Sequence, residues 1–210
     1  MASNLDYTSL PGSASELTWE IARLFPAQGC WTEDEYLALQ TNQLIEFTDG
    51  RLEFLPMPTA LHQLIAGFLY RALIDFVKSR KLGMVLMAAF KVKVGERKFR
   101  EPDVQFMFAS NAARMRNEFW TGADLVMEIV SPDDPHRDLV QKRAEYATAG
   151  IAEYWIVHPR EATITILQLD GASYPDQPPI HEGQIAASAL LPGFAVEVAA
   201  VFEEGRAALK

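Results

Sequence analysis

The order of elements in the second half of the chain constrains the fold most. Residues 124–130 form an apolar run of strand length, which is typical of a strand buried within a sheet. A break at residues 132–135 holds two prolines, and residues 138–149 then have helical spacing and end at Gly150. A strand is predicted next, over residues 154–157. A buried strand and a helix beside it are therefore expected.

Three helices, a hairpin and further strands are predicted elsewhere. Asp49-Gly50 is the strongest signal, because a two-residue hairpin turn needs positive φ at both positions. Thr32 begins a short helix, with acids in its first turn, that ends near Gln40. The other predicted elements are a short helix over 14–25, hairpin strands over 44–48 and 51–55, a long helix over 59–80, and strands over 84–94, 99–108, 163–169 and 194–198. This order predicts a mixed α/β (α+β) fold, a central mixed β-sheet flanked by helices.

Composition indicates one soluble domain. Of 210 residues, 49% are hydrophobic and 22% charged, which suits a chain with a single sizeable core. The first 15 residues lack the basic start and apolar run of a signal peptide, and no segment has the uninterrupted apolar length of a membrane span. The single cysteine, Cys30, has no disulfide or metal-site partner and is expected to be a small buried residue. A cytoplasmic protein with no membrane partner is expected.

Charge is distributed unevenly. The formal net charge of -9 argues against a protein that coats duplex DNA non-specifically, because that affinity comes largely from Lys and Arg. Residues 91–100 are nevertheless basic and hold only one acid, Glu96. This segment predicts either a basic rim that contacts DNA or a solvated hairpin. The DNA-contact candidates are Lys91, Lys93, Arg97, Lys98 and Arg100, with Arg143 further along the chain.

Glu128 is the most informative single residue. It lies in the middle of the apolar run, where an ionised carboxylate must be paired, neutralised or bound to a metal ion. The alternative is a glutamate that faces water on an edge strand. Asp103 is the second candidate acid, because Pro102 cannot donate to a ladder and so places Asp103 where a strand begins.

Two cations of the helix over 138–149 lie within its apolar arc. The polar arc is predicted to hold Asp138, Gln141, Glu145 and Thr148, with Leu139 and Val140 on the other side. Lys142 and Arg143 both point toward the apolar side, so at least one of them is expected to meet the buried acid. Periodicity does not separate a catalytic lysine from a structural salt bridge.

The hairpin adds a third candidate acid. A two-residue turn at 49–50 places Glu46 opposite Glu53, and like charges directly across a strand pair are unfavourable. One of the two should therefore bend into solvent or find a cation. Glu46 is the candidate of interest.

Other chemistries have weaker support. Four scattered histidines form no zinc-binding spacing, and the serine-hydrolase elbow, Walker and Rossmann glycine patterns do not occur. Two carboxylates would also suit glycoside hydrolysis, but that reaction has no obvious need for Lys142. The histidines are His62, His136, His158 and His181.

An ordered set of short motifs resembles one family. The motifs are Glu46 before Asp49-Gly50, Pro102-Asp103, residues 128–132 (EIVSP), residues 138–146, Ala149-Gly150, residues 153–157 (EYWIV) and residues 191–194 (LPGF). Together they resemble the Uma2 family, also known as DUF820, of restriction-endonuclease-like proteins from cyanobacteria and other bacteria. The resemblance covers residues 31–202, which leaves an N-terminal tail and short helix over 1–30 and a C-terminal tail over 203–210. It implies the restriction-endonuclease-like fold of PD-(D/E)XK nucleases.

The resemblance also implies the site. Asp103 matches the family's PD aspartate, Glu128 matches its strand acid, and Lys142 matches a lysine displaced onto the next helix, since Val130 stands at the usual lysine position. Glu46 matches an additional acid, with Gln141 and Tyr146 as supports. Mg²⁺ or Mn²⁺ is expected on Asp103, Glu128 and the backbone carbonyl of Ile129, with Glu46 as a further candidate ligand.

The implied function is metal-dependent DNA endonuclease activity with no organic cofactor. A homodimer would let two sites cut both strands. The alternative is a catalytically silent nucleic-acid or protein binding module on the same fold, which the acidic net charge favours.

Overall fold

Two β-sheets and the helices packed on them make up the protein. The computed structural model describes residues 26–39, 41 and 43–207, so the helix expected over 14–25 lies outside the described residues. A five-stranded sheet has the order β2-β1-β5-β4-β7, a six-stranded sheet has the order β11-β10-β9-β8-β6-β3, and β12 pairs with β13. The pairs β4–β7 and β8–β9 are parallel, while the other pairs are antiparallel, as expected of a mixed sheet.

The helices are α2 (Glu33–Leu37), α3 (Ala60–Arg80), the 3₁₀ segment η2 (Ala109–Arg114), the π-helical turn η3 (Arg137–Gln141), α4 (Lys142–Thr148) and α5 (Val198–Ala207). The strands are β1 (Ile45–Thr48), β2 (Arg51–Phe54), β3 (Gly83–Met87), β4 (Lys91–Gly95), β5 (Lys98–Arg100), β6 (Val104–Phe108), β7 (Phe119–Thr121), β8 (Leu125–Ile129), β9 (Glu153–His158), β10 (Thr163–Gln168), β11 (Ile180–His181), β12 (Ile185–Ala187) and β13 (Ala195–Glu197).

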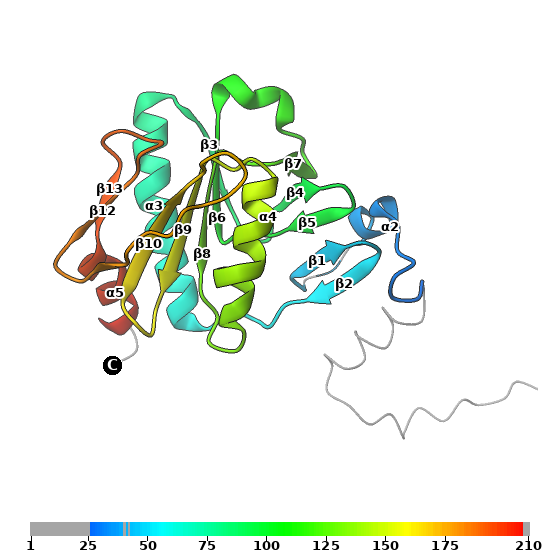
Figure 1. Ribbon diagram of the computed structural model, residues 1–210, viewed down its shortest axis with the longest axis horizontal. Helices are drawn as coiled ribbons and strands as arrows, with labels where there is room; N and C mark the ends of the chain where they lie inside the picture. Colours follow the sequence, from blue (N-terminus) through cyan, green and yellow to red (C-terminus); the bar gives the residue numbers. More distant parts are fainter. Residues whose placement is uncertain (1–25, 40, 42, 208–210) are drawn as a thin grey trace, which may run out of the picture.

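Helices α3 and α4 cover opposite faces of the six-stranded sheet (Figure 1). Side chains alternate along β8, so Leu125, Met127 and Ile129 join the core beneath α3. Val126 joins a second core with Tyr146 of α4. Glu128 shares the parity of Val126 and therefore faces α4, which places its carboxylate opposite the lysine of that helix.

Helix α3 is a core helix. Its buried residues Ile65, Leu69, Leu73 and Val77 recur every four positions and pack against the sheet. By length and composition alone α3 could cross a membrane, but core helices pass the same test. Helix α5 packs beside α3 and extends to Ala207, past residue 203 where the sequence predicted the C-terminal tail to begin.

Local sequence signals in the first half are confirmed. Thr32 caps α2 through a capping box in which its hydroxyl accepts the Glu35 N–H and the Glu35 carboxylate accepts the Thr32 N–H. The turn residues Asp49 and Gly50 have φ of 47° and 81°, as the hairpin requires.

The prediction that Cys30 is buried was wrong. Cys30 is exposed, because the neighbouring Trp31 takes the core position.

Two long predicted strands are each divided between the sheets. Residues 84–94 form β3 in the six-stranded sheet and β4 in the five-stranded sheet, and residues 99–108 form β5 and β6 in the same way. Pro102 interrupts the second segment because it has no N–H to donate. Ala88 and Ala89 interrupt the first, and neither has the branched side chain that favours a strand. The prediction of continuous strands was wrong.

The helix predicted over 138–149 begins as a π-helical turn. Asp138 is 4% exposed, whereas Leu139 and Val140 are 37% and 51% exposed, so the polar arc expected from α-helical spacing was wrong in this turn. The wider π-helical turn changes the direction of successive side chains relative to the rest of the helix. Asp138 is thereby placed on the buried side with Lys142.

Candidate active site

A buried lysine and three carboxylates meet between the two sheets. Lys142 Nζ lies 2.9 Å from Glu128 Oε2, 3.2 Å from Asp138 Oδ1 and 3.7 Å from Glu46 Oε1. Glu46 comes from β1, Glu128 from β8, and the other two from consecutive helical turns. All four side chains are buried. The sequence prediction that a cation of this helix meets Glu128 is confirmed, and that cation is Lys142.

Asp103 joins the cluster from the position just before β6, the strand beside β8. Val104 pairs with Met127, and this antiparallel register places Asp103 opposite Glu128. Asp103 Oδ2 accepts the Ile129 N–H at 2.7 Å. In an extended strand the N–H and C=O of one residue point to the same side, so the Ile129 carbonyl also faces the Asp103 side. The three predicted ligand groups are therefore neighbours.

Glu128 is held at both oxygens. Its Oε2 contacts Lys142, and its Oε1 accepts a short hydrogen bond from the Tyr146 hydroxyl. Burial raises the pKa of Glu128 to about 8, with further upward pressure from Asp103 and Asp138, although Lys142 opposes the shift. Burial alone would lower the pKa of Lys142, but Glu128, Glu46 and Asp138 raise it, so the lysine stays charged. The three carboxylates of the cluster therefore outnumber its single lysine.

Glu46 has three cations around its buried carboxylate. It is fully buried, and its carboxylate contacts Arg137, lies 3.4 Å from Arg100 Nε and accepts the Glu101 N–H at 3.2 Å. Burial acts to raise its pKa, but Lys142, Arg100 and Arg137 together lower that pKa to about 2. Arg137 also reaches Glu53 Oε2 at 3.5 Å. Of the two outcomes expected for this pair of glutamates, solvent exposure or a nearby cation, the structure shows the cation, Arg137.

This low pKa predicts an acid-dependent loss of stability. The pKa of Glu46 is depressed in the fold, so its carboxylate stabilises the protein fully above about pH 4.5 and loses that effect as pH falls toward 2. Glu46→Gln should therefore lower the free energy of unfolding at pH 7 by up to on the order of 3 kcal/mol, and by much less at pH 3, with the melting temperature falling accordingly. Thermal melts at both pH values measure this, with Glu53→Gln as control. An equal loss at both pH values would contradict it.

Two site residues were missed by the sequence reasoning. Asp138 was predicted to lie on the outer polar arc. It precedes Lys142 by four residues, however, and this spacing puts the two side chains on the same face of a helix, so the sequence did carry a signal for their contact. His62 was set aside as one of four scattered histidines, yet its Nε2 lies 3.2 Å from Asp103 Oδ2. Burial lowers the pKa of His62, but the hydrogen bond and charge of Asp103 outweigh this and raise it. Only the tertiary structure joins helix α3 to this site.

The two residues predicted to support the site, Gln141 and Tyr146, lie in different environments. Tyr146 is buried and holds Glu128, whereas Gln141 is exposed. Arg143 points away from the cluster and contacts Asp176 at 2.7 Å. Of the two candidate cations, Lys142 and Arg143, only Lys142 faces the carboxylates.

The basic candidates for DNA contact have partners within the protein. Arg100 is buried and forms two hydrogen bonds of 2.7 Å with Glu145. Contacts of the others are Lys93 with Glu33 at 2.5 Å, Lys98 with Glu145 at 3.1 Å, Arg97 with the Trp31 carbonyl at 3.1 Å, and Lys91 over the Tyr36 ring at 4.9 Å. Each of these basic side chains therefore already has a partner within the protein.

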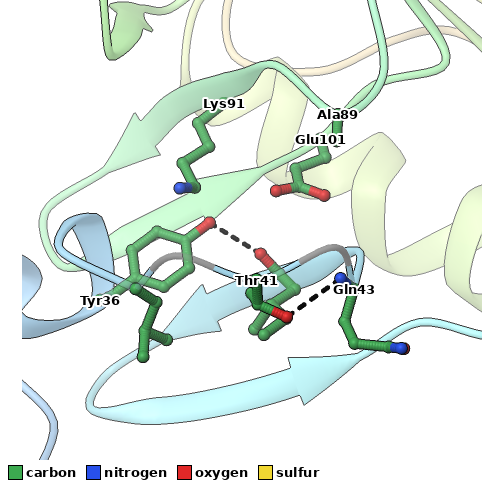
Figure 2. A pocket seen from close by; sticks show the side chains of 8 residues that line it. Tyr36, Thr41, Gln43, Ala89, Lys91 and Glu101 are labelled. Carbon is green, nitrogen blue, oxygen red and sulfur yellow. Dashed lines mark hydrogen bonds between the residues drawn. The ribbon is translucent and has the colours of Figure 1, made fainter.

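A small hollow is lined in part by Tyr36, Thr41, Lys91 and Glu101 (Figure 2). The Glu101 side chain is buried, and its Oε2 has no hydrogen-bond partner among the described residues. Burial and the charge of Glu46 raise the pKa of Glu101 to about 8. Protonation of Glu101 at neutral pH limits the charge packed against Glu46.

The donor set suits a hard divalent cation. Among the described residues no three His, Cys, Asp or Glu side chains form a ready-made metal site. Oxygen donors are nevertheless grouped: the carboxylates of Asp103 and Glu128 and the carbonyl side of Ile129. Burial, with Asp103 and Asp138 nearby, raises the pKa of Glu128, and a cation bound beside its carboxylate would oppose that rise. The residues present therefore fit Mg²⁺ or Mn²⁺.

Comparisons with known proteins establish the family and the fold. The Uma2 family model, whose description is "Putative restriction endonuclease", matches residues 33–199. A solved structure of "a putative nuclease belonging to DUF820" from Anabaena variabilis ATCC 29413 superposes with a TM-score of 0.65 and 19% identity, covering 82% of this chain and 97% of that one. No match is found among curated proteins. The predicted fold class is confirmed, and family and fold together support a restriction-endonuclease-like nuclease. The chain therefore belongs to the Uma2 family.

Proposed function

We propose that the protein is a divalent-metal-dependent DNA endonuclease. The observation that carries this proposal is the placement of Asp103 opposite Glu128 on adjacent strands, with the charged end of Lys142 at 2.9 Å from Glu128. Proteins of the restriction-endonuclease type generally use divalent metals. Two acids and a lysine in this arrangement supply the groups that phosphodiester hydrolysis needs.

Asp103, Glu128 and the Ile129 carbonyl would hold Mg²⁺ or Mn²⁺, with Glu46 as a further candidate. The bound ion would polarise the phosphodiester and lower the pKa of a water molecule. Lys142 would stabilise the negative charge that develops on the phosphoryl group. Tyr146 would fix the Glu128 carboxylate through its hydrogen bond, which prepares the site before substrate arrives.

Cleavage of supercoiled plasmid tests the function. The purified protein should nick or linearise plasmid in Mg²⁺ or Mn²⁺ and leave it intact in EDTA. Asp103→Ala should lower the rate by at least about hundredfold, because removing an electrostatic contributor of this kind costs that much or more. Equal cleavage by the variant would reject the assignment of Asp103. A homodimer would favour linear product over nicked circles, because two sites could cut both strands.

A catalytically silent binding module is the second candidate. The net charge of -9 and the internal ion pairs of the basic side chains favour it. A calorimetric titration with Mg²⁺ or Mn²⁺ separates the two: the nuclease should bind metal and lose that binding in Glu128→Ala. Absent or unaffected binding would favour the silent module.

A further inference from the structure

The three cations around the buried Glu46 carboxylate differ in how many of their donors the protein uses. Arg100 donates hydrogen bonds through all three of its side-chain nitrogens. Lys142 contacts two further carboxylates of the cluster. Among the described residues, Arg137 donates through Nη2 alone, to Glu46 and Glu53. Arg137 is therefore the cation with unused donors.

The unused donors of Arg137 are open to solvent. The described part of the chain provides no acceptor for its Nε or Nη1, and neither atom is among the buried polar atoms that lack a partner. The Arg137 side chain is 18% exposed, and its contact with Glu53 is long, at 3.5 Å. Three N–H groups of a planar guanidinium can therefore be reached from outside the protein.

Arg137 lies beside Lys142, with one carboxylate between them. Its Nη2 contacts Glu46 Oε2, whereas Lys142 Nζ lies 3.7 Å from Glu46 Oε1. Glu46 is fully buried and also accepts the Glu101 N–H, which holds the carboxylate in place. One DNA strand carries a phosphate about every 3.4 Å along the helix axis. Two cations on either side of one carboxylate can therefore meet phosphates that lie close together on a strand.

The chemistry of the guanidinium selects an anion as its ligand. Arginine is always charged and has no acceptor atom, so it cannot hold a metal ion. Its paired N–H groups match the oxygens of a phosphate, and such charge-assisted hydrogen bonds are stronger than neutral ones. An exposed guanidinium beside Lys142 thus suits a second phosphate of the substrate.

We propose that Arg137 binds a DNA phosphate next to the one that is cleaved, and that Glu46 holds the guanidinium in position. This inference rests on the proposed function, because it assumes that the cleaved phosphate lies at Lys142. It goes further by naming a side chain that holds the substrate, one that the basic segment over 91–100 does not include.

The salt dependence of DNA binding gives the first test. A fluorescein-labelled duplex is titrated in EDTA, where no cleavage is expected, at about 50 to 200 mM salt. Arg137→Gln should weaken binding about tenfold and reduce the slope of log K against log salt by about one, because one phosphate contact is lost. Arg80→Gln removes the same charge at the far end of α3, about 27 Å along the helix from His62, and should change binding less than about twofold.

Two further variants keep the test decisive if Arg137→Gln fails to fold, which thermal melts would show. Arg137→Lys keeps the charge, so it should keep the salt slope but weaken binding about threefold because the fork of N–H groups is lost. Glu53→Gln leaves Arg137 in place and removes a partly exposed acid beside it, so binding should tighten about threefold. Glu197→Gln removes an exposed acid from β13, in the separate two-stranded sheet, and should leave binding unchanged.

Cleavage kinetics give a readout that a purely structural role would not produce. A phosphate beside the cleaved one is bound equally before and during the reaction, so Arg137→Gln should raise KM about tenfold and change kcat less than about threefold. An equal fall of kcat and kcat/KM would contradict this.

Four binding results would overturn the inference: no DNA binding by wild type, an unchanged salt slope in Arg137→Gln, equal weakening by Arg80→Gln, or no tightening in Glu53→Gln. Plasmid cleavage together with an unchanged salt slope would reject the Arg137 contact and leave the nuclease standing. Binding that depends on Arg137, without cleavage of any DNA, would keep the phosphate contact and reject the nuclease.

Discussion

Replacing Lys142 by methionine is expected to destabilise the protein by on the order of 3 to 5 kcal/mol, because removing one partner of a buried ion pair leaves its counter-charges unpaired. Methionine fills the same space, so the effect isolates the charge. Glu46, Glu128 and Asp138 all lose their contact with the ammonium group. Thermal melting should show a fall of roughly 10 °C for a chain of this size.

The loss should grow with pH. The pKa of Glu128 is already raised to about 8, and without Lys142 it rises further. A carboxyl whose folded pKa is raised stabilises the fold while protonated, and that effect is lost as pH rises through the folded pKa. Lys142→Met should therefore be closer to wild type at pH 6 than at pH 9. The opposite trend would contradict the placement of the ammonium group beside Glu128.

A double variant separates stability from chemistry. At pH 9, Glu128→Gln combined with Lys142→Met removes one charge of each sign and should recover part of the lost stability, but cleavage should remain at least about hundredfold below wild type. Arg143→Met is the matched control for stability, because its partner Asp176 is 93% exposed and exposed pairs contribute about 1 kcal/mol or less. Recovery of cleavage in the double variant would remove Lys142 from the mechanism.

Replacing Glu153 by alanine is expected to cost a similar amount, on the order of 3 to 5 kcal/mol, for a different reason. Glu153 is fully buried at the start of β9, and its carboxylate accepts four hydrogen bonds. The donors are Trp155 Nε1 at 2.7 Å, the Ser188 hydroxyl at 2.6 Å, and the Ala189 and Leu190 N–H groups at 2.8 and 2.9 Å. Alanine would leave the buried Trp155 and Ser188 donors unsatisfied and would remove the acceptor of the other two N–H groups.

Glu153 therefore ties β9 to the segment before β13, which joins two motifs that are distant in the sequence. Glu153→Gln should lose less stability, since its amide oxygen can still accept two of the bonds. Glu161→Gln, an exposed change just beyond β9, should alter the melting temperature little. A small effect of Glu153→Ala in chemical denaturation would show that water replaces the carboxylate.

Local elements were predictable because their causes are local. The capping box at Thr32 and the turn at Asp49-Gly50 depend on residues within four positions of each other, so the sequence carried the whole signal. Glu128 was predictable as a buried acid because the apolar neighbours on its own strand require burial. A contact between this acid and a cation of the next helix was predictable as well, because that helix packs on the strand, but the choice of Lys142 over Arg143 was not.

Other features depended on packing between distant segments. The division of residues 84–94 and 99–108 between two sheets follows from pairing partners that lie elsewhere in the chain. Arg137 satisfies Glu46 across 91 positions, and His62 reaches Asp103 from another helix. The pattern of residues within one segment does not indicate which distant segment it will contact.

The sequence by itself determined the turns, the caps, the buried strand and its acid, because each depends on near neighbours and on the cost of burying charge without a partner. Only the tertiary structure decided which cations and which histidine complete the site. The physical reason is that a buried carboxylate requires a partner without specifying where in the chain that partner lies, and the packing of α3 and of the π-helical turn makes that choice.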